Sequence, residues 1–282
     1  MIQKLYFILR DFSEKMKRQN ISAYAASIAF FFFLSIVPML IMVCTIIPYT
    51  PLTEQDLVML VTDLLPEMIA PLAESLIADV YARSSGVLSI AAIATVWSAA
   101  KGVMALMRGL NAVNGVEEKR NYFLVRAVAS FYTLVMLVVL VLSLFIMVFG
   151  NQLVNLALHR FPQLQSVVSF AMNFRFILVW LLLTLLFAAV YAYVPNGKLE
   201  FREQIPGAIF SAVVWSVFSW AFSVYVTYGN SYGIYGSLSI IIIVLLWMYM
   251  CMYIIMIGAY LNRYFASVNH ALVNRHGSGE KD

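Results

Sequence analysis

Long uncharged, apolar stretches dominate the pattern of hydrophobic and polar positions along the chain. The hydrocarbon core of a bilayer is about 30 Å thick, so a helix needs about 20 mainly apolar residues to cross it. Stretches of this length predict six spanning helices, at residues 25–48, 86–106, within 127–158, 176–195, 207–228 and 238–261. The predicted fold class is therefore all-α, a polytopic integral membrane protein with six transmembrane helices.

The composition agrees with this prediction. Hydrophobic residues make up 63% of the 282 positions and charged residues 11%, whereas a soluble domain carries about 25% charged residues. The 18 basic and 14 acidic residues are too few to cover a core of this length with a water-exposed surface. Most of the apolar surface is therefore expected to face lipid.

The distribution of lysine and arginine predicts the orientation of the spans. Loops on the cytoplasmic side are enriched in these residues. Placing both termini in the cytoplasm leaves only Arg83, Arg160 and Arg175 of the 18 Lys and Arg residues outside. We therefore expect a cytoplasmic amphipathic helix at 1–24, a six-span membrane domain at 25–262 with an outer amphipathic segment at 53–83, and a polar cytoplasmic tail at 263–282.

The two amphipathic segments each allow two interpretations. In 1–24, apolar residues recur at helical spacing with basic residues between them, which fits a helix on the anionic inner leaflet or one packed on the protein's own cytoplasmic face. In 53–83, the pattern predicts two short helices that bend at 66–71. The acidic residues of this segment form a solvated helix face, or they attract cations or a basic partner.

A basic face on the second span is the first candidate site. Lys101 and Arg108 are seven residues apart, so they share one face of a helix, and Ser98 and Asn111 lie close to that face. Charges inside a span usually pair or line a cavity. These four residues are candidate contacts for an anionic ligand or lipid, above all a phosphate group at the inner leaflet. The alternative is that Lys101 extends to the headgroups without binding a ligand.

A second group of residues in the last two spans is a candidate for a pathway or for helix packing. Tyrosines and glycines near 225–236 fit an aromatic belt at the outer interface or a loop that dips back into the bilayer. Pro206 and Gly207 suit a first helical turn and close helix packing. The members of this group are Pro206, Gly207, Tyr225, Tyr235, Gly236 and Trp247.

Other kinds of chemistry find little support in the sequence. Cys44 and Cys251 have no disulfide or metal-site spacing, and the three histidines are scattered. The predicted spans contain no Asp or Glu, which disfavours a proton-coupled or cation-coupled carrier. The basic residues do not gather on a soluble module, so no nucleic-acid partner is expected. We predict no catalytic residue, no metal site and no cofactor.

The order of short motifs along residues 25–262 is similar to that of one known family. The chain resembles the YihY/virulence factor BrkB family of six-span membrane proteins, formerly labelled ribonuclease BN. That family usually has a glutamate after the Gly258-Ala259 pair, where this chain has Tyr260. The resemblance rests on Ala29-Phe30, Leu34 to Pro38, Trp97-Ser98, Lys101-Gly102, Arg108 to Asn111, Tyr193 to Asn196, Pro206 to Ala208, Trp215, Tyr225, Tyr235-Gly236, Trp247 and Gly258-Ala259.

The resemblance implies an envelope-related, multi-pass protein of the bacterial plasma (inner) membrane, without an agreed activity. Ribonuclease activity is not expected, because metal-dependent RNA cleavage needs a cluster of His and carboxylate ligands. The leading hypothesis is transport or translocation of an anionic lipid or small molecule, with Lys101 and Arg108 at the inner leaflet. The alternative is a non-transporting assembly or scaffold protein. Membrane lipids, anionic ones among them, are the expected partners, and a homo-oligomer is left open.

Overall fold

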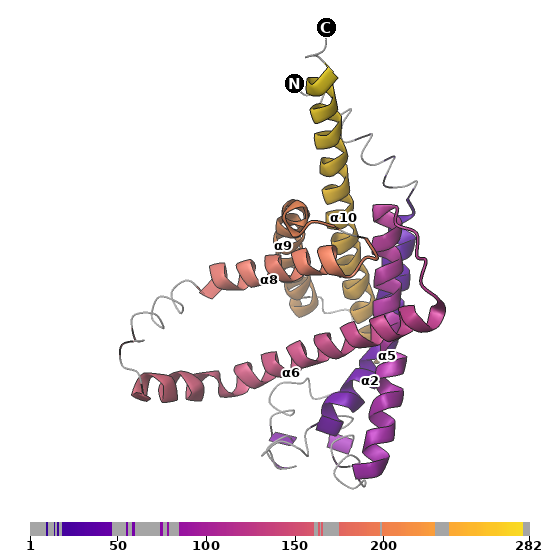
Figure 1. The fold of residues 1–282 in the computed structure, drawn as a ribbon. Helices are drawn as coiled ribbons and strands as arrows, with labels where there is room; N and C mark the ends of the chain where they lie inside the picture. The colour runs from indigo at the N-terminus through magenta and orange to yellow at the C-terminus, as the bar shows by residue number, and fades with distance from the viewer. Residues whose placement is uncertain are drawn as a thin grey trace. The chain divides into compact units, whose positions relative to one another are not determined.

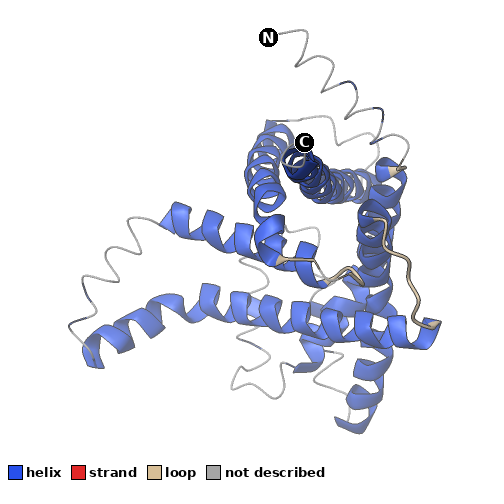
Figure 2. Ribbon diagram, turned by 45° about the horizontal axis from the view of Figure 1, so that its top comes forward, coloured by secondary structure: helices blue, strands red, loops and turns tan. Residues whose placement is uncertain are grey.

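The computed structural model describes residues 19–46, 85–160, 175–197, 199–228 and 237–278, together with isolated positions at 10, 14, 16, 55, 58, 59, 74, 75, 78, 163 and 165. Within these residues the regular structure is helical, without a strand (Figure 2). Figure 1 labels the long helices, and a short 3-10 helix precedes α9. They are α2 (Ile21–Ile46), α5 (Ser85–Asn114), α6 (Tyr122–Arg160), α8 (Arg175–Tyr193), η3 (Phe201–Gln204), α9 (Ile205–Tyr228) and α10 (Ser237–Ser278).

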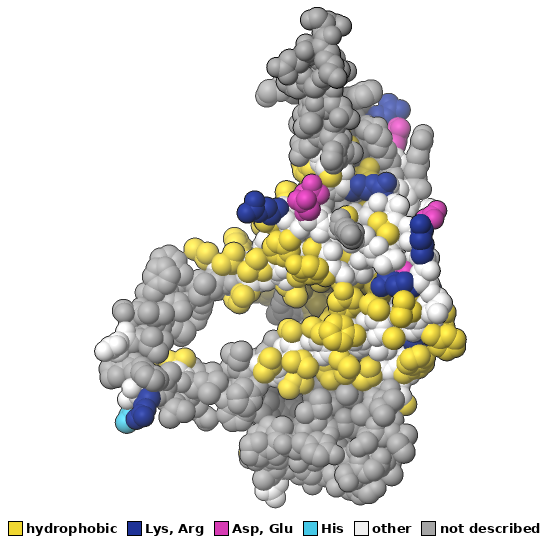
Figure 3. Space-filling view, in the orientation of Figure 1, with side chains coloured by type: hydrophobic (Ala, Val, Ile, Leu, Met, Phe, Trp, Pro, Cys, Tyr) yellow, Lys and Arg dark blue, Asp and Glu magenta, His cyan; other side chains and the backbone are white. Residues whose placement is uncertain are grey.

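Each predicted span overlaps one of these long helices. Over the described residues, four segments are long and apolar enough to cross a membrane: Ile21–Met39, Tyr122–Val139, Phe201–Val226 and Ile241–Ala266. A shorter apolar helix occupies Val179–Tyr193. Apolar side chains cover the visible faces of α8 and of the first half of α6 (Figure 3). The all-helical membrane class is confirmed for this part of the chain. That the chain crosses the membrane six times, and that both termini lie in the cytoplasm, stay predictions.

Local sequence explains where α5 ends and α6 begins. Gly115 has a φ of 65°, a left-handed conformation that glycine adopts without strain. Its N–H donates to the Ala112 carbonyl at 3.2 Å and the Val116 N–H to the Asn111 carbonyl at 2.9 Å, a Schellman cap that closes the helix. Asn121 then caps α6, because its Oδ1 accepts from the Leu124 N–H at 2.8 Å.

The chain divides into two compact units. Unit 1 comprises Met1–Phe31, Ala105–Arg120 and Asn151–Asp282, and unit 2 comprises Phe32–Met104 and Asn121–Gly150. In unit 1, α9 packs against both α8 and α10. In unit 2, the Ser35 hydroxyl of α2 donates to the Ala99 carbonyl of α5 at 3.1 Å. A Cβ at Gly102 would lie 3.2 Å from the Phe32 ring, so α2 and α5 are in close contact there.

The segments at the edges of the predicted membrane domain are described only in part. Most of 1–24 and of 53–83 lies outside the described residues, although the Arg10 Nε lies 2.9 Å from Glu14 Oε1 one helical turn along. α10 continues to Ser278, well past the predicted end of the last span at 261. No Gly or Pro occurs between Gly258 and Gly277, so no helix-breaking residue interrupts the helix there.

Candidate functional site

The predicted basic face is present on α5. Lys101, Arg108 and Ser98 are all exposed on this continuous helix. Neither basic side chain forms an ion pair with an acidic residue among the positions that the structure describes. Their spacing of two helical turns therefore places two positive charges along one exposed face of α5.

Asn111 lies in a different environment from the other three candidate contacts. Its side chain is buried, with 4% of its surface exposed. Its Nδ2 donates to Glu118 Oε2 at 3.1 Å, and its Oδ1 accepts from the Asn196 backbone N–H at 2.8 Å. Asn111 therefore ties the end of α5 to the following loop and to the turn after α8.

Glu118 is the centre of this polar cluster. Arg120 holds both of its carboxylate oxygens, with Nε 2.8 Å from Oε1 and Nη2 2.8 Å from Oε2. Asn196 Nδ2 donates to the same carboxylate at 3.1 Å. The Arg120 hydrogen bond, aided by the Asn111 amide, lowers the pKa of Glu118 below its usual value of 4.5. The cluster fastens the 115–121 loop while the carboxylate is ionised.

This cluster predicts a pH-dependent contribution to stability. Because the folded-state pKa of Glu118 is lowered, its contribution is complete above the unfolded value and is lost as pH falls through the folded value. We expect Glu118→Gln to lower the free energy of unfolding by about 1 kcal/mol at neutral pH, and the difference from the unsubstituted protein to vanish in acid. Thermal unfolding in detergent across this pH range measures it.

The matched control for that prediction is the exposed neighbour Glu117. Glu117→Gln removes the same charge without removing an acceptor from the cluster. Equal losses of stability in the two variants, or a Glu118→Gln effect that persists in acid, would contradict a role for the Glu118 carboxylate in fastening the loop.

A second polar arrangement lies where α9 crosses α10 in unit 1. Asn262 is 2% exposed. Its Oδ1 accepts from the Gly207 N–H at 2.6 Å, and its Nδ2 donates to the Gln204 carbonyl at 3.1 Å. Because the first N–H groups of a helix have no partner within it, the α10 side chain completes the start of α9.

About one helical turn away from this contact along α9 and α10, Tyr191 of α8 joins these two helices. Its hydroxyl lies 2.7 Å from Ser211 Oγ and donates to the Ile255 carbonyl at 2.8 Å. Gly258 lies between these groups, and a Cβ there would overlap Ser211 Oγ. Helices in membranes approach closely where small residues meet, and this crossing depends on Gly207 and Gly258.

The remaining candidates for a pathway or packing fall into three environments. Gly207 is buried in the crossing, whereas Pro206 and Tyr225 are exposed. Trp247 is half-buried, and its ring centroid lies 6.3 Å from that of Trp215. Tyr235 and Gly236 lie outside the described residues, so the interpretation of their loop stays a prediction.

Arg126 is a residue that the sequence did not single out. The third span was predicted to lie within 127–158, with Arg126 in the loop before it, but α6 begins at Tyr122, so Arg126 belongs to the helix. Its side chain is 3% exposed, and its guanidinium donates to the Trp97 carbonyl of α5. Asn121, a residue type favoured at helix N-termini, was the local signal for the earlier start.

A known family matches nearly the whole chain, the helices of both units included. The sequence profile of the family described as virulence factor BrkB matches residues 12–280. The chain belongs to this BrkB family. The match covers α2, α5, α6, α8 and α9 completely and all of α10.

Individual relatives agree with the membership of the BrkB family. The putative ribonuclease-like protein YfkH of Bacillus subtilis (strain 168) is 34% identical over 84% of this chain and 87% of its own length. A UPF0761 membrane protein of Alkalilimnicola ehrlichii is 26% identical over 95% of this chain and 60% of its own length. The chain thus spans less than two thirds of that second relative. No solved structure matches.

The Bacillus relative is named ribonuclease-like, so the question is whether the described side chains include those that a nuclease requires. A metal-dependent nuclease needs a cluster of His, Cys or carboxylate ligands. Within the described ranges, no three such side chains are grouped to hold a metal ion. Tyr260, which follows the Gly258-Ala259 pair, is 3% exposed and lies inside α10.

Proposed function

We propose that this BrkB-family membrane protein moves an anionic lipid or small anion across the bacterial plasma membrane. Lys101 and Arg108 contact the negatively charged group at the inner leaflet in this proposal. The observation that carries it is the pair of exposed charges on α5, a helix otherwise rich in apolar residues, for which the described residues supply no ion-pair partner. Charges kept within a membrane helix usually serve a ligand or a partner.

Lipid flux in vesicles that contain the full-length protein tests the proposal. A phosphatidylglycerol carrying a fluorescent group is placed in the inner leaflet, and its arrival outside is followed by chemical quenching. We expect Lys101→Ala and Arg108→Ala each to slow this movement about tenfold, since losing one charge-assisted hydrogen bond costs about 1.5–3 kcal/mol. The exposed Arg202 of η3 supplies the control, Arg202→Ala, which is expected to move lipid at the unsubstituted rate.

A non-transporting assembly protein is the second candidate. The buried polar groups of α8, α9 and α10 bond to one another, as Asn262 does to Gly207 and Gln204. Such contacts pack helices and need no ligand. Equal flux in vesicles with the unsubstituted protein, in both variants and in protein-free vesicles would favour this second candidate and overturn the first.

A further inference from the structure

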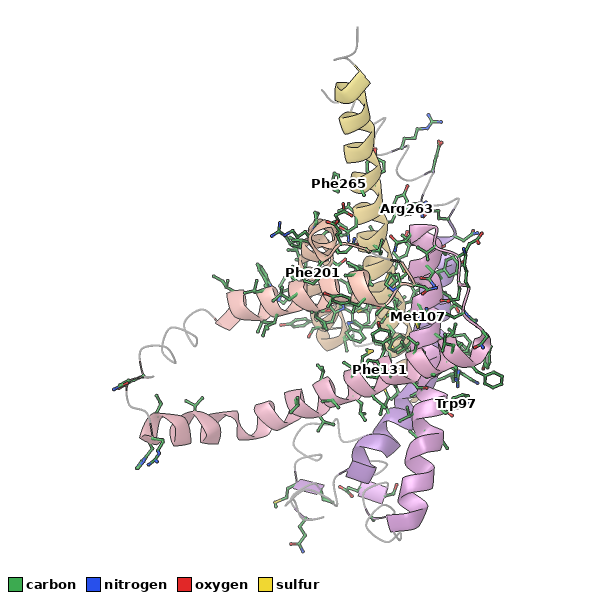
Figure 4. All side chains as sticks on the ribbon, in the orientation of Figure 1. Trp97, Met107, Phe131, Phe201, Arg263 and Phe265 are labelled. Atoms are coloured by element: carbon green, nitrogen blue, oxygen red, sulfur yellow. The ribbon has the colours of Figure 1, made fainter. Side chains whose placement is uncertain are left out.

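Arg126 is a buried cation in unit 2. It lies on α6 close to the start of that helix, with 3% of its surface exposed. Its guanidinium carbon lies 5.1 Å from the centroid of the Trp97 ring. One terminal nitrogen donates to the Trp97 carbonyl, and the other lies 3.3 Å from Met104 Sδ. Both of these residues belong to α5, and Figure 4 labels Trp97.

The contacts of Arg126 do not neutralise its charge. A guanidinium carries several N–H donors and no acceptor. The acceptors present are one carbonyl oxygen, a weakly accepting thioether and the face of an indole ring, while the buried Nε has no hydrogen-bond partner within the described ranges. No carboxylate contacts this side chain among the residues that the structure describes. A buried cation without a negative charge is strongly unfavourable.

Arg120 shows how a compensated arginine looks in the same protein. Its Nε and Nη2 each lie 2.8 Å from a carboxylate oxygen of Glu118. That two-pronged geometry is the one that guanidinium groups adopt with carboxylates and phosphates. Arg126 has the same set of donors at a buried position, and its described contacts include no anion.

A second positive charge, Lys101, lies on the same face of α5 as the two residues that Arg126 contacts. Trp97, Lys101 and Met104 are spaced by four and three residues, so they follow one another along one face of the helix. Arg126 contacts the first and the last of them, and the exposed Lys101 lies between the two. Trp97 keeps 45% of its surface exposed although its ring lies against the buried guanidinium.

We propose that Arg126 and Lys101 together bind the phosphate group of an anionic ligand, at a site beside the Trp97 ring. The free Nε and a terminal nitrogen of Arg126 supply a two-pronged donor set, and the Lys101 ammonium supplies the second charge. The distribution of Lys and Arg predicts that the second half of α5 and the start of α6 lie toward the inner leaflet, where lipid phosphates lie. The site rests on the proposed function in that its ligand is taken to be an anion.

Binding to the purified full-length protein in neutral detergent tests the proposal without requiring transport. The probes are short-chain phosphatidylglycerol, a diacylglycerol with the same acyl chains, and inorganic phosphate, titrated by calorimetry. We expect phosphatidylglycerol to bind and diacylglycerol not to bind. Arg126→Gln should weaken phosphatidylglycerol binding about tenfold, since a hydrogen bond to a charged group is lost, and Lys101→Gln should weaken it and reduce its salt dependence.

Two further variants separate binding from folding. Arg126→Lys keeps the charge and loses the two-pronged geometry, so it should fold and bind with intermediate affinity. Arg202→Gln removes an exposed arginine of η3 in unit 1 and should bind as the unsubstituted protein does. Binding of inorganic phosphate with the affinity of phosphatidylglycerol, and with the same dependence on Arg126, would support the site with a soluble anion as ligand.

The outcomes for this site and for transport are distinguishable. If Lys101→Gln and Arg126→Lys both bind phosphatidylglycerol with unchanged affinity, the binding site is overturned. The same holds if Arg126→Gln binds with unchanged affinity and only unfolds at a lower temperature. Arg126 is then a packing residue. Arg126-dependent binding without any lipid flux would support the site and count against transport. If lipid flux depends on Lys101 and Arg108 but phosphatidylglycerol affinity does not change when Arg126 is replaced, only the Arg126 site is overturned.

Discussion

Replacing Gly258 by alanine is expected to destabilise the crossing of α9 and α10 strongly, although the substitution adds a single methyl group. The new Cβ would overlap Ser211 Oγ and lie 2.8 Å from the Gly207 carbonyl oxygen. Relieving this overlap requires the two backbones to separate, which breaks the Tyr191 hydrogen bonds to Ser211 and Ile255. Overpacking of this kind costs about 3 kcal/mol. Thermal unfolding of the full-length protein in detergent measures the loss.

Ala221 provides the control for this substitution. It is exposed on α9, so Ala221→Leu adds more volume at a position where nothing must move. Its effect on the free energy of unfolding is expected to stay within about 0.5 kcal/mol. An unfolding temperature for Gly258→Ala equal to that of Ala221→Leu would show that the crossing tolerates a side chain and would contradict the packing described for it.

Replacing Asn262 by alanine is the second substitution with a large expected effect. It removes the acceptor of the Gly207 N–H and the donor to the carbonyl and the side-chain oxygen of Gln204. These groups are buried, and each one left without a partner costs about 1–3 kcal/mol. We therefore expect the free energy of unfolding to fall by about 3 kcal/mol. Chemical unfolding in mixed micelles followed by circular dichroism measures this change.

An asparagine with only a local bond serves as the comparison. The Asn114 Nδ2 donates to the Leu110 carbonyl of its own helix at 2.9 Å, so Asn114→Ala removes an amide without separating two helices. A much smaller loss is expected there. If the two alanine variants lose equal stability, the link from α10 to the start of α9 contributes nothing of its own.

The helices could be predicted from the sequence because lipid imposes a length and an apolar character on each span. The same physics explains why α5 was predicted despite Lys101, since the run from 86 to 106 is otherwise uncharged and mainly apolar. The third span was predicted only to lie within the uncharged run 127–158, whereas α6 extends further toward the N-terminus and is capped by Asn121. That difference placed Arg126 in a loop and hid its burial.

The contacts between helices could not be predicted in the same way. Gly207 was expected to suit close packing, but its partners Gly258 and Asn262 lie more than fifty residues further along the chain. Local periodicity contains no information about which helices pair. Likewise, Asn111 was assigned to the basic face from its spacing, and only the turn after α8 reveals the acceptor role of its side chain.

The fastened 115–121 loop has a practical consequence for labelling this protein. A short polar connection between two helices normally invites insertion of an epitope or a fluorescent domain. Here the guanidinium of Arg263 occupies the space beside Gly115 and donates to the Val113 carbonyl, while Asn196 reaches Glu118. An insert at this connection would pull apart three segments distant in sequence, so tags belong at the chain ends instead.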